Sequence, residues 1–374
     1  MDLGGTKLAT AIVDADGALH HRASVPLGGR RGHDVASLII ERCEAACARL
    51  RELGEGASAG KPAAVGITVP GIYRAAQGTV WAPNIPEWDD YPLRDALVRA
   101  LGADVPVVID SDRAAYVLGE TWLGAARGAR HAIVIAVGTG IGAGIMVDGT
   151  VLRGASDIAG AIGWLALDRP FREPYVSCGC FEHHASGPGL VKVALALLDG
   201  GAGDDDDAGE DGDASDDGDT SYDGELRRMP RDAITTAHIF AAYDRGDAVA
   251  TRVLDDAIAY WGMAAANLVS LFNPEVIVFG GGVFGPAARF IDRIRDEAVQ
   301  WAQPIAVRET RFVASTLHGD AGLFGAARLA MLASGEALPT KPSSSPAASP
   351  STHSSSSAAP SAAPPSAPST SRAT

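Results

Sequence analysis

Residues 131–149 read HAIVIAVGTGIGAGIMVDG, an apolar run that passes directly into a turn containing three glycines. The first part, residues 131–138, is rich in β-branched side chains and predicts a buried strand. The turn is Gly138-Thr139-Gly140-Ile141-Gly142. Glycine lets the backbone come close to a ligand, so converging N–H groups in such a turn can bind phosphate.

The same pattern of a strand followed by glycines occurs twice more. It appears at Asp2-Leu3-Gly4-Gly5-Thr6-Lys7 and at VIVFGGG, residues 276–282. A single glycine turn is as often only a turn, but three in one chain indicate a nucleotide site. None is a Walker loop or a complete GxGxxG motif. The predicted ligands for a nucleotide and a metal ion are therefore Asp2, whose carboxylate is placed to hold the metal, with Gly4, Gly5, Thr6, Lys7, Gly138, Thr139, Gly140, Gly142, Gly280, Gly281 and Gly282.

The rest of the chain alternates between strand and helix patterns, which predicts an α/β fold. A hairpin is expected at 8–25 with its turn at 14–17, and strands at 63–69, 105–110 and 276–282. Helices are expected at 36–53, 112–123, 248–272 and 320–333.

Composition limits the function classes. The 374 residues are 47% hydrophobic, enough for two lobes with sizeable cores, and no apolar run is long enough to cross a membrane. The net charge of −15 disfavours nucleic acid as a partner. The four cysteines form no disulfide framework, and no signal peptide is evident, so a reducing cytoplasm is expected.

Two segments have the composition of disordered chain. Residues 200–225 form an acidic insertion that holds about a dozen of the acidic side chains and almost no apolar ones. A calcium loop is the sharper interpretation of its Asp-Gly-Asp runs, but the required ligand spacing and closing Glu are missing. The tail at 339–374 is rich in Ser, Ala and Pro.

The motifs, in their order and spacing, resemble the ROK family of repressors, uncharacterised reading frames and sugar kinases. The similarity runs from residue 1 to about residue 332, apart from the acidic insertion. The matching segments are DLGGTK from Asp2, GITVPG from Gly66, APNIPEW from Ala82, SDRAAYVLGE from Ser111, GTGIGAGIMVDG from Gly138, GAIGW from Gly160, CFEHHASG from Cys180, NPEVIVFGGG from Asn273 and GDAGLFGAA from Gly319.

The resemblance implies an actin-like ATPase (ribonuclease H-like) fold, with ATP in a cleft between two lobes. The N-terminal lobe would span 1–110 with a closing helix at 320–333, and the C-terminal lobe 111–319. The glycines of 4–5 and of 138–142 would form two phosphate loops, and those of 280–282 would lie near the adenosine. A small-molecule sugar as substrate and a homodimer are also implied.

Asp112 is the candidate general base for phosphoryl transfer, which needs a carboxylate to accept the proton of the attacking hydroxyl. By position alone, Ser111 and Asp112 are ordinary helix-capping residues. The family motif here is Asn-Asp, with the Asp as base, so the resemblance gives Asp112 that role. Ser111 stands where relatives have a sugar-contacting Asn.

The sugar pocket departs further from the family pattern. Relatives carry Glu-Ile-Gly-His, where this chain has Ala161-Ile162-Gly163-Trp164. Loss of the Glu should cost about 1.5–3 kcal/mol of binding for an ordinary hexose. Trp164 is expected either to stack on a sugar face or to fill core space. Glu182 and Asn84 match retained sugar-side positions, and Asp157 is a possible replacement for the lost carboxylate.

The cysteines raise the question of zinc. Many relatives hold a structural zinc with that His and three cysteines, but here the His is Trp164 and only Cys178 and Cys180 remain. Tetrahedral zinc needs four ligands. His183 and His184 follow closely, and we expect them to be surface or packing residues and the protein to contain little zinc.

In relatives, the first strand already contains several residues before the position that matches Asp2. Its missing part would leave a neighbouring strand partly unpaired. Either the start lies upstream or the lobe tolerates a short strand.

Three functions remain. The first is a hexose kinase that uses ATP to phosphorylate the 6-hydroxyl of the sugar, with Asp112 as base. The second is a non-catalytic sugar or nucleotide sensor, because the sugar pocket is altered while the phosphate loops persist. A repressor is disfavoured, because no room precedes DLGGTK for a helix-turn-helix domain.

Overall fold

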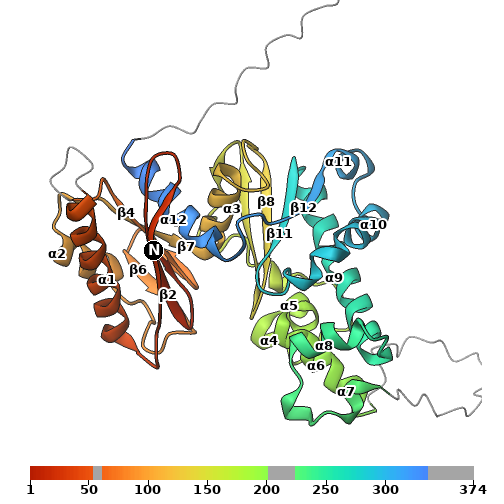
Figure 1. Cartoon of the computed structure of the whole chain (residues 1–374). Helices are drawn as coiled ribbons and strands as arrows, with labels where there is room; N and C mark the ends of the chain where they lie inside the picture. The colour runs from red at the N-terminus through yellow and green to blue at the C-terminus, as the bar shows by residue number, and fades with distance from the viewer. Residues whose placement is uncertain (54–60, 201–223, 336–374) are drawn as a thin grey trace, which may run out of the picture. The chain divides into compact units, whose positions relative to one another are not determined.

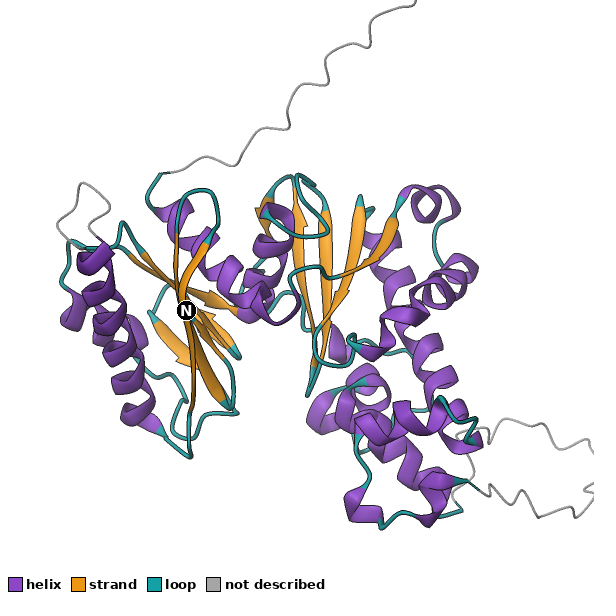
Figure 2. Ribbon diagram, viewed as in Figure 1, coloured by secondary structure: helices purple, strands orange, loops and turns teal. Residues whose placement is uncertain are grey.

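Two five-stranded mixed sheets carry the fold in a computed structural model that describes residues 1–53, 61–200 and 224–335 (Figures 1 and 2). The first sheet has the order β3-β2-β1-β4-β7, with β1 Asp2–Leu3, β2 Lys7–Val13, β3 Leu19–Pro26, β4 Val65–Val69 and β7 Val107–Ser111. The second has the order β10-β9-β8-β11-β12, with β8 Ala132–Val137, β9 Ile141–Val147, β10 Thr150–Val151, β11 Val276–Gly280 and β12 Arg311–Ala314. A small ribbon pairs β5 Ile72–Arg74 with β6 Thr79–Trp81.

In the first sheet, β1, β4 and β7 run parallel, while β2 and β3 form an antiparallel hairpin. The hairpin turn is fixed by Asp14, whose Oδ1 accepts the N–H groups of Asp16 and Ala18 at 3.1 and 2.8 Å. Because parallel strands end at the same edge, the glycine turn after β1 and Asp112 after β7 emerge on one side of this sheet.

In the second sheet, β8, β11 and β12 run parallel, and β9 and β10 are antiparallel additions. Ala136 of β8 is the register partner of Gly280 in β11. The glycine turns that follow these two strands therefore start side by side at one edge of the sheet.

Helices supply the layers around both sheets (Figure 2). Their bounds are α1 Gly32–Leu53, α2 Leu93–Leu101, α3 Asp112–Trp122, α4 Tyr175–Cys178, α5 Cys180–Ala185, α6 Gly187–Leu198, α7 Glu225–Arg228, α8 Thr236–Tyr243, α9 Ala248–Phe272, α10 Ile291–Trp301, α11 Pro304–Glu309 and α12 Ala321–Ala333. Short 3₁₀ turns lie at η1 Ile162–Trp164, η2 Arg231–Ala233, η3 Pro286–Phe290 and η4 His318–Asp320.

Helices α3 and α12 pack against each other, α3 also contacts β8 and β9, and α12 also contacts β4. Glycine makes the crossing possible, because a Cβ added at Gly325 would lie 2.0 Å from the carbonyl oxygen of Ala115. A substitution there would force the two helices apart. This pair fixes where the N-terminus of α3, and with it Asp112, is held.

The expected strands and helices are present with small shifts. The hairpin and the helix at 248–272 lie where the sequence predicts them, while α1 begins at Gly32, four residues before the predicted start at 36. Helix α9 has clear end signals, because Asp247 Oδ1 accepts the N–H of Ala250 at 2.9 Å and Asn273 takes a left-handed conformation.

The predicted insertion at 200–225 and the tail at 339–374 lie almost wholly outside the described residues. Glu225 begins α7, so this residue belongs to a helix rather than to the insertion. The proposed lobe boundary at residue 110 falls inside β7. None of the helices that the structure describes could span a membrane.

Candidate active site

Asp2 lies in β1 at the start of the first glycine turn. Its Oδ1 accepts a hydrogen bond of 2.8 Å from the hydroxyl of Thr68 in β4. A Cβ added at Gly322, in the first turn of α12, would lie 2.4 Å from the Asp2 carboxylate carbon. The carboxylate is thus seated against the N-terminal end of α12, where helix backbone N–H groups favour negative charge.

The first glycine turn is closed by the N–H of Gly4, which donates to the carbonyl of Lys7 at 2.9 Å. Gly5, Thr6 and Lys7 are exposed. Asn84 is exposed too and packs against Gly5, where an added Cβ would be 3.2 Å from the Asn84 Cβ. The structure therefore brings one predicted sugar-side residue beside the first predicted phosphate loop.

The second and third glycine turns are neighbours. Val283, just after the third turn, donates its N–H to the carbonyl of Val137 at 3.0 Å, and Gly138 accepts an N–H from Gly187 at 2.9 Å. Gly281 has φ +87°, and a Cβ there would be 2.3 Å from the oxygen of Val137. Thr139 and Gly140 of one turn and Gly281 and Gly282 of the other are exposed.

Asp112 is half-buried at the first residue of α3, and its Oδ1 accepts the N–H of Arg113 at 2.8 Å. Burial raises the pKa of Asp112 to about 6, because removal from water disfavours the charged carboxylate. The positive charge of Arg113 opposes this rise, and the negative charge of Asp2 adds to it. A carboxyl that titrates near neutral pH suits a general base.

Arg113 was missed by the sequence reasoning. Its guanidinium donates to the carbonyls of Ile158 at 3.2 Å and Gly71 at 3.4 Å. Its side chain passes over the second glycine turn, since a Cβ added at Gly142 would be 3.0 Å from the Arg113 Cδ. This residue therefore links the predicted base to a predicted phosphate loop. Its position next to Asp112 was the only signal in the sequence.

Glu182 lies in α5 and contacts the same loop. Its Oε2 accepts the N–H of Ile141 at 2.7 Å, and a Cβ added at Gly140 would be 2.8 Å from that oxygen. Burial raises the pKa of Glu182, although the bond from Ile141 favours its charged form. The hydrogen bond shows that a residue predicted for the sugar side also positions the glycine turn.

Two predicted substrate residues have surroundings that the sequence left open. Ser111 is buried and its Oγ accepts the N–H of Ala114 at 3.3 Å, so it acts as the N-cap of α3. Its hydroxyl proton is not used in that bond. Trp164 is 58% exposed, which rules out the reading that it fills core space. Ala161 precedes it as the residue that caps η1.

Asp157 takes a left-handed conformation, and its carboxylate accepts the N–H of Ala75 at 3.3 Å. It lines a cavity of about 280 Å³ together with Asp110 and Arg153, which form an ion pair at 2.5 Å. This contact gives Asp157 a role in holding the β5–β6 ribbon. The suggestion that it replaces the lost sugar-binding Glu stays a prediction.

The candidate zinc ligands lie around α4 and α5. His184 is buried, its ring meets the Tyr175 hydroxyl at 2.7 Å, and burial lowers its pKa to about 4. His183 is half-buried, and Cys180 is buried while Cys178 is half-buried. Within residues 1–53, 61–200 and 224–335, no three His, Cys, Asp or Glu side chains gather as a metal site. The His184 ring also stacks on Tyr260, with centroids 4.6 Å apart, so its contacts are those of a packed side chain.

The contacts join the predicted residues into two neighbouring groups. Asp2, Gly5 and Asn84 belong to the turn after β1, whereas Glu182 and the glycines of 138–142 and 280–282 belong to the second sheet. Asp112 and Arg113 connect the two groups. The negative charge of Asp2 raises the pKa of Asp112, and the side chain of Arg113 lies against Gly142.

A profile of the ROK family matches residues 1–332. The chain is 30% identical to a glucokinase of Halalkalibacterium halodurans over 87% of this chain and 92% of that protein. A glucokinase of Streptomyces griseus, solved with glucose and AMPPNP, is 30% identical with a TM-score of 0.63, covering 88% of this chain and 98% of that one. A xylose repressor of Caldicellulosiruptor bescii is 31% identical over 62% of this chain and 53% of that protein.

The chain belongs to the ROK family, as the motifs predicted. The predicted α/β fold of the actin-like kind is confirmed, because the matches to solved family members extend over most of both chains. The similarity to glucokinases supports the expectation of a carbohydrate kinase.

Proposed function

We propose that this ROK-family chain is a hexose kinase that transfers the γ-phosphoryl group of magnesium-ATP to the 6-hydroxyl of a sugar. The observation that carries the proposal is the placement of Asp112, which is half-buried at the start of α3 with a pKa of about 6. Its neighbour Arg113 lies over Gly142 of a phosphate loop. A base for a hydroxyl is thus held beside a loop suited to phosphate.

The residues divide the reaction between them. Asp112 would accept the proton of the attacking hydroxyl, and Glu182 would hold another hydroxyl of the sugar while it fixes Ile141. Backbone N–H groups of the three glycine turns would bind the phosphates of ATP and hold the nucleotide in place. Phosphoryl transfer depends mainly on such positioning and charge stabilisation.

The donor set fits a magnesium ion. Mg²⁺ is commonly held by one or two carboxylates together with phosphate oxygens and water. Asp2 offers one carboxylate, of which Oδ1 accepts a hydrogen bond from Thr68 and Oδ2 would be the metal ligand. The carboxylate lies next to an exposed turn that suits phosphate. When bound, the ion would neutralise charge on the transferring phosphoryl group.

A coupled assay of ADP release over a panel of hexoses tests the proposal. We expect at least one hexose to stimulate ADP release with the wild-type protein and not with Asp112→Asn. If no sugar stimulates release although the protein binds an ATP analogue, the second candidate is the better one.

That second candidate is a non-catalytic sugar or nucleotide sensor. The observation in its favour is that Trp164 is largely exposed. The family resemblance implies a Glu and a His at the positions of Ala161 and Trp164. Retention of Asp112 beside the phosphate loops favours the kinase, because a binding protein has less need of a base.

The family resemblance also leads us to propose a homodimer acting in the cytoplasm on a small sugar, without nucleic-acid or membrane partners. Large apolar side chains on α9 to α11 are exposed, namely Leu271, Val299, Trp301 and Ile305. Large apolar side chains exposed on neighbouring helices are typical of subunit contacts. Light scattering at two protein concentrations tests the proposal, and a stable monomer would contradict it.

A further inference from the structure

Glu120 is a fully buried carboxylate in the second half of α3, and the proposed reaction does not use it. Removing a carboxylate from water is costly unless hydrogen bonds compensate. Its Oε2 accepts the N–H of Ala125 at 2.8 Å, just beyond the end of α3, and its Oε1 accepts the hydroxyl proton of Ser315. The second bond joins residues 195 positions apart in the chain, so Glu120 does more than close the end of its own helix.

Ser315 lies at the third glycine turn. It follows β12 directly, and its N–H donates to the carbonyl of Phe279 at 2.8 Å, which continues the parallel pairing of β11 with β12 by one residue. A Cβ added at Gly280, the first glycine of the turn, would lie 3.4 Å from the Ser315 Cβ. The side chain that Glu120 binds therefore packs against the turn predicted to contact the adenosine.

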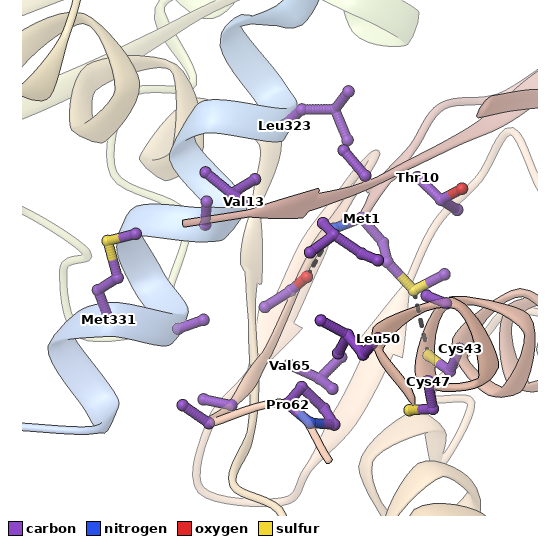
Figure 3. A pocket seen from close by; sticks show the side chains of 18 of the residues that line it. Met1, Thr10, Val13, Cys43, Cys47, Leu50, Pro62, Val65, Leu323 and Met331 are labelled. Atoms are coloured by element: carbon purple, nitrogen blue, oxygen red, sulfur yellow. Dashed lines mark hydrogen bonds between the residues drawn. The ribbon is translucent and has the colours of Figure 1, made fainter. Parts of the chain in front are cut away.

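The chain after Ser315 passes from the second sheet to the first. It runs through η4 into α12, whose second residue, Gly322, lies against the Asp2 carboxylate. Leu323 of α12 and Val65 of β4 border the same cavity of about 240 Å³, which shows that this helix packs on the first sheet (Figure 3). The short connection thus joins the predicted adenosine contact on one sheet to the predicted magnesium ligand on the other.

Helix α3 holds both ends of that connection. A Cβ added at Gly119 would lie 2.8 Å from the carbonyl oxygen of Ala321, the first residue of α12, so the two backbones touch there. The next residue, Glu120, binds Ser315 at the other end. Asp112 is the first residue of the same helix. One helix therefore contacts the third glycine turn through Ser315, supports the start of α12 and carries the proposed base.

We propose that Glu120 is a positioning residue for the nucleotide, because through Ser315 it fixes the third glycine turn relative to Asp2 and Asp112. This role rests on the proposed function and belongs to a residue that would touch neither substrate. A carboxylate suits the position, since each of its oxygens serves one donor. Without the bond to Ser315 the turn keeps its strand pairing but loses its tie to α3, so magnesium-ATP should bind more weakly.

Ser315→Ala tests this role, because it removes the donor and leaves the bond from Ala125 in place. Thr310→Val is the matched control. Thr310 is buried immediately before β12, at the end of the strand away from the turn, and its hydroxyl donates to the carbonyl of Pro274 at 2.9 Å. Calorimetry with a non-hydrolysable ATP analogue and magnesium should show a Kd raised roughly tenfold in Ser315→Ala and changed less than about twofold in Thr310→Val.

Glu120→Gln is the conservative variant that should restore the contact without the charge. The glutamine amide can donate to the hydroxyl oxygen of Ser315 while its carbonyl accepts the N–H of Ala125, so the Kd should stay within about threefold of the wild-type value.

Amide hydrogen exchange on the protein without nucleotide gives a readout that does not depend on binding. The paired N–H groups of Val283 and of residue 315 should exchange at least about tenfold faster in Ser315→Ala than in the wild type or Thr310→Val. A wild type that binds no analogue would contradict the proposed kinase, and the exchange rates would still decide whether Glu120 holds the turn. Exchange rates that are equal in Ser315→Ala and Thr310→Val, or an equal Kd where the analogue binds, would overturn the proposal.

Discussion

The phosphate side and the sugar side of the proposed active site differ in how their residues are used. The glycine turns after β1, β8 and β11 are at least partly exposed and held by backbone contacts. On the predicted sugar side, Ser111 caps a helix, Ala161 has no polar side chain and Trp164 is exposed. The difference teaches that, in the proposed site, nucleotide recognition would rest on backbone geometry, whereas sugar recognition would rest on side chains that can change singly without disturbing the fold.

The largest expected effect is that of Asp112→Asn, which lies where the two sides meet. The amide keeps the shape of the side chain but cannot accept a proton, so the rate of phosphoryl transfer should fall roughly 10²–10⁴-fold. Binding of an ATP analogue should persist. Rates come from ADP release and binding from calorimetry.

Asp110→Asn is the matched control, because Asp110 is buried two residues earlier and pairs with Arg153 instead of facing the glycine turns. We expect it to lower the melting temperature and leave kcat largely intact. Equal losses of kcat in both variants would mean that Asp112 acts only through the fold.

Glu182→Gln should have the next largest effect. A hydrogen bond to a charged group contributes about 1.5–3 kcal/mol, so KM for the sugar should rise roughly 10- to 100-fold. The glutamine carbonyl can still accept the N–H of Ile141, and nucleotide affinity should change little. Glu182→Ala, which removes that acceptor, should weaken nucleotide binding as well. Nucleotide affinity that is unchanged in Glu182→Ala would separate this residue from the phosphate loop.

The sequence predicted the backbone part of this site better than the side-chain part. Glycine after a buried strand has few alternatives, and parallel strands bring their ends together, so the grouping of residues 138–142 with 280–282 followed from topology. The exposure of Trp164 and the reach of Arg113 did not, because both depend on tertiary contacts that lie outside any local pattern.

The double change Ala161→Glu with Trp164→His tests whether the sugar side can be restored. It returns the carboxylate and imidazole seen in relatives, and KM for glucose should fall by about tenfold or more. Because Trp164 is exposed, the melting temperature should shift little. The single change Trp164→His, which lacks the new carboxylate, is the control. The same KM in the double variant and the wild type would show that position 161 does not contact sugar.

The smallest effect concerns the pH dependence set by Asp112. Its pKa of about 6 lies above that of an exposed Asp, so activity should fall as the pH drops through about 6 and the base becomes protonated. Arg113→Gln removes a positive charge and should move this acidic limb to higher pH, while Arg113→Lys should keep it in place. An unchanged limb in Arg113→Gln would assign the titration to another group.

The raised pKa of Asp112 also makes the stability of the folded protein depend on pH. The folded protein holds the proton more tightly than the unfolded chain, so stability falls as the pH rises from about 4 to about 6 and stays at the lower level above that. The gain in melting temperature from Asp112→Asn should therefore be larger at pH 8 than at pH 4. An equal gain in melting temperature at pH 4 and pH 8 would show that the Asp112 carboxyl is solvated.

Calorimetric titration of the wild type and of the Ala161→Glu, Trp164→His variant, with a non-hydrolysable ATP analogue and magnesium and separately with glucose, tests the contrast between the two sides most directly. We predict that both proteins bind the analogue with similar affinity and that the variant binds glucose more tightly than the wild type does. Tight glucose binding by the wild type, or no analogue binding at millimolar concentration by the folded protein, would contradict the account.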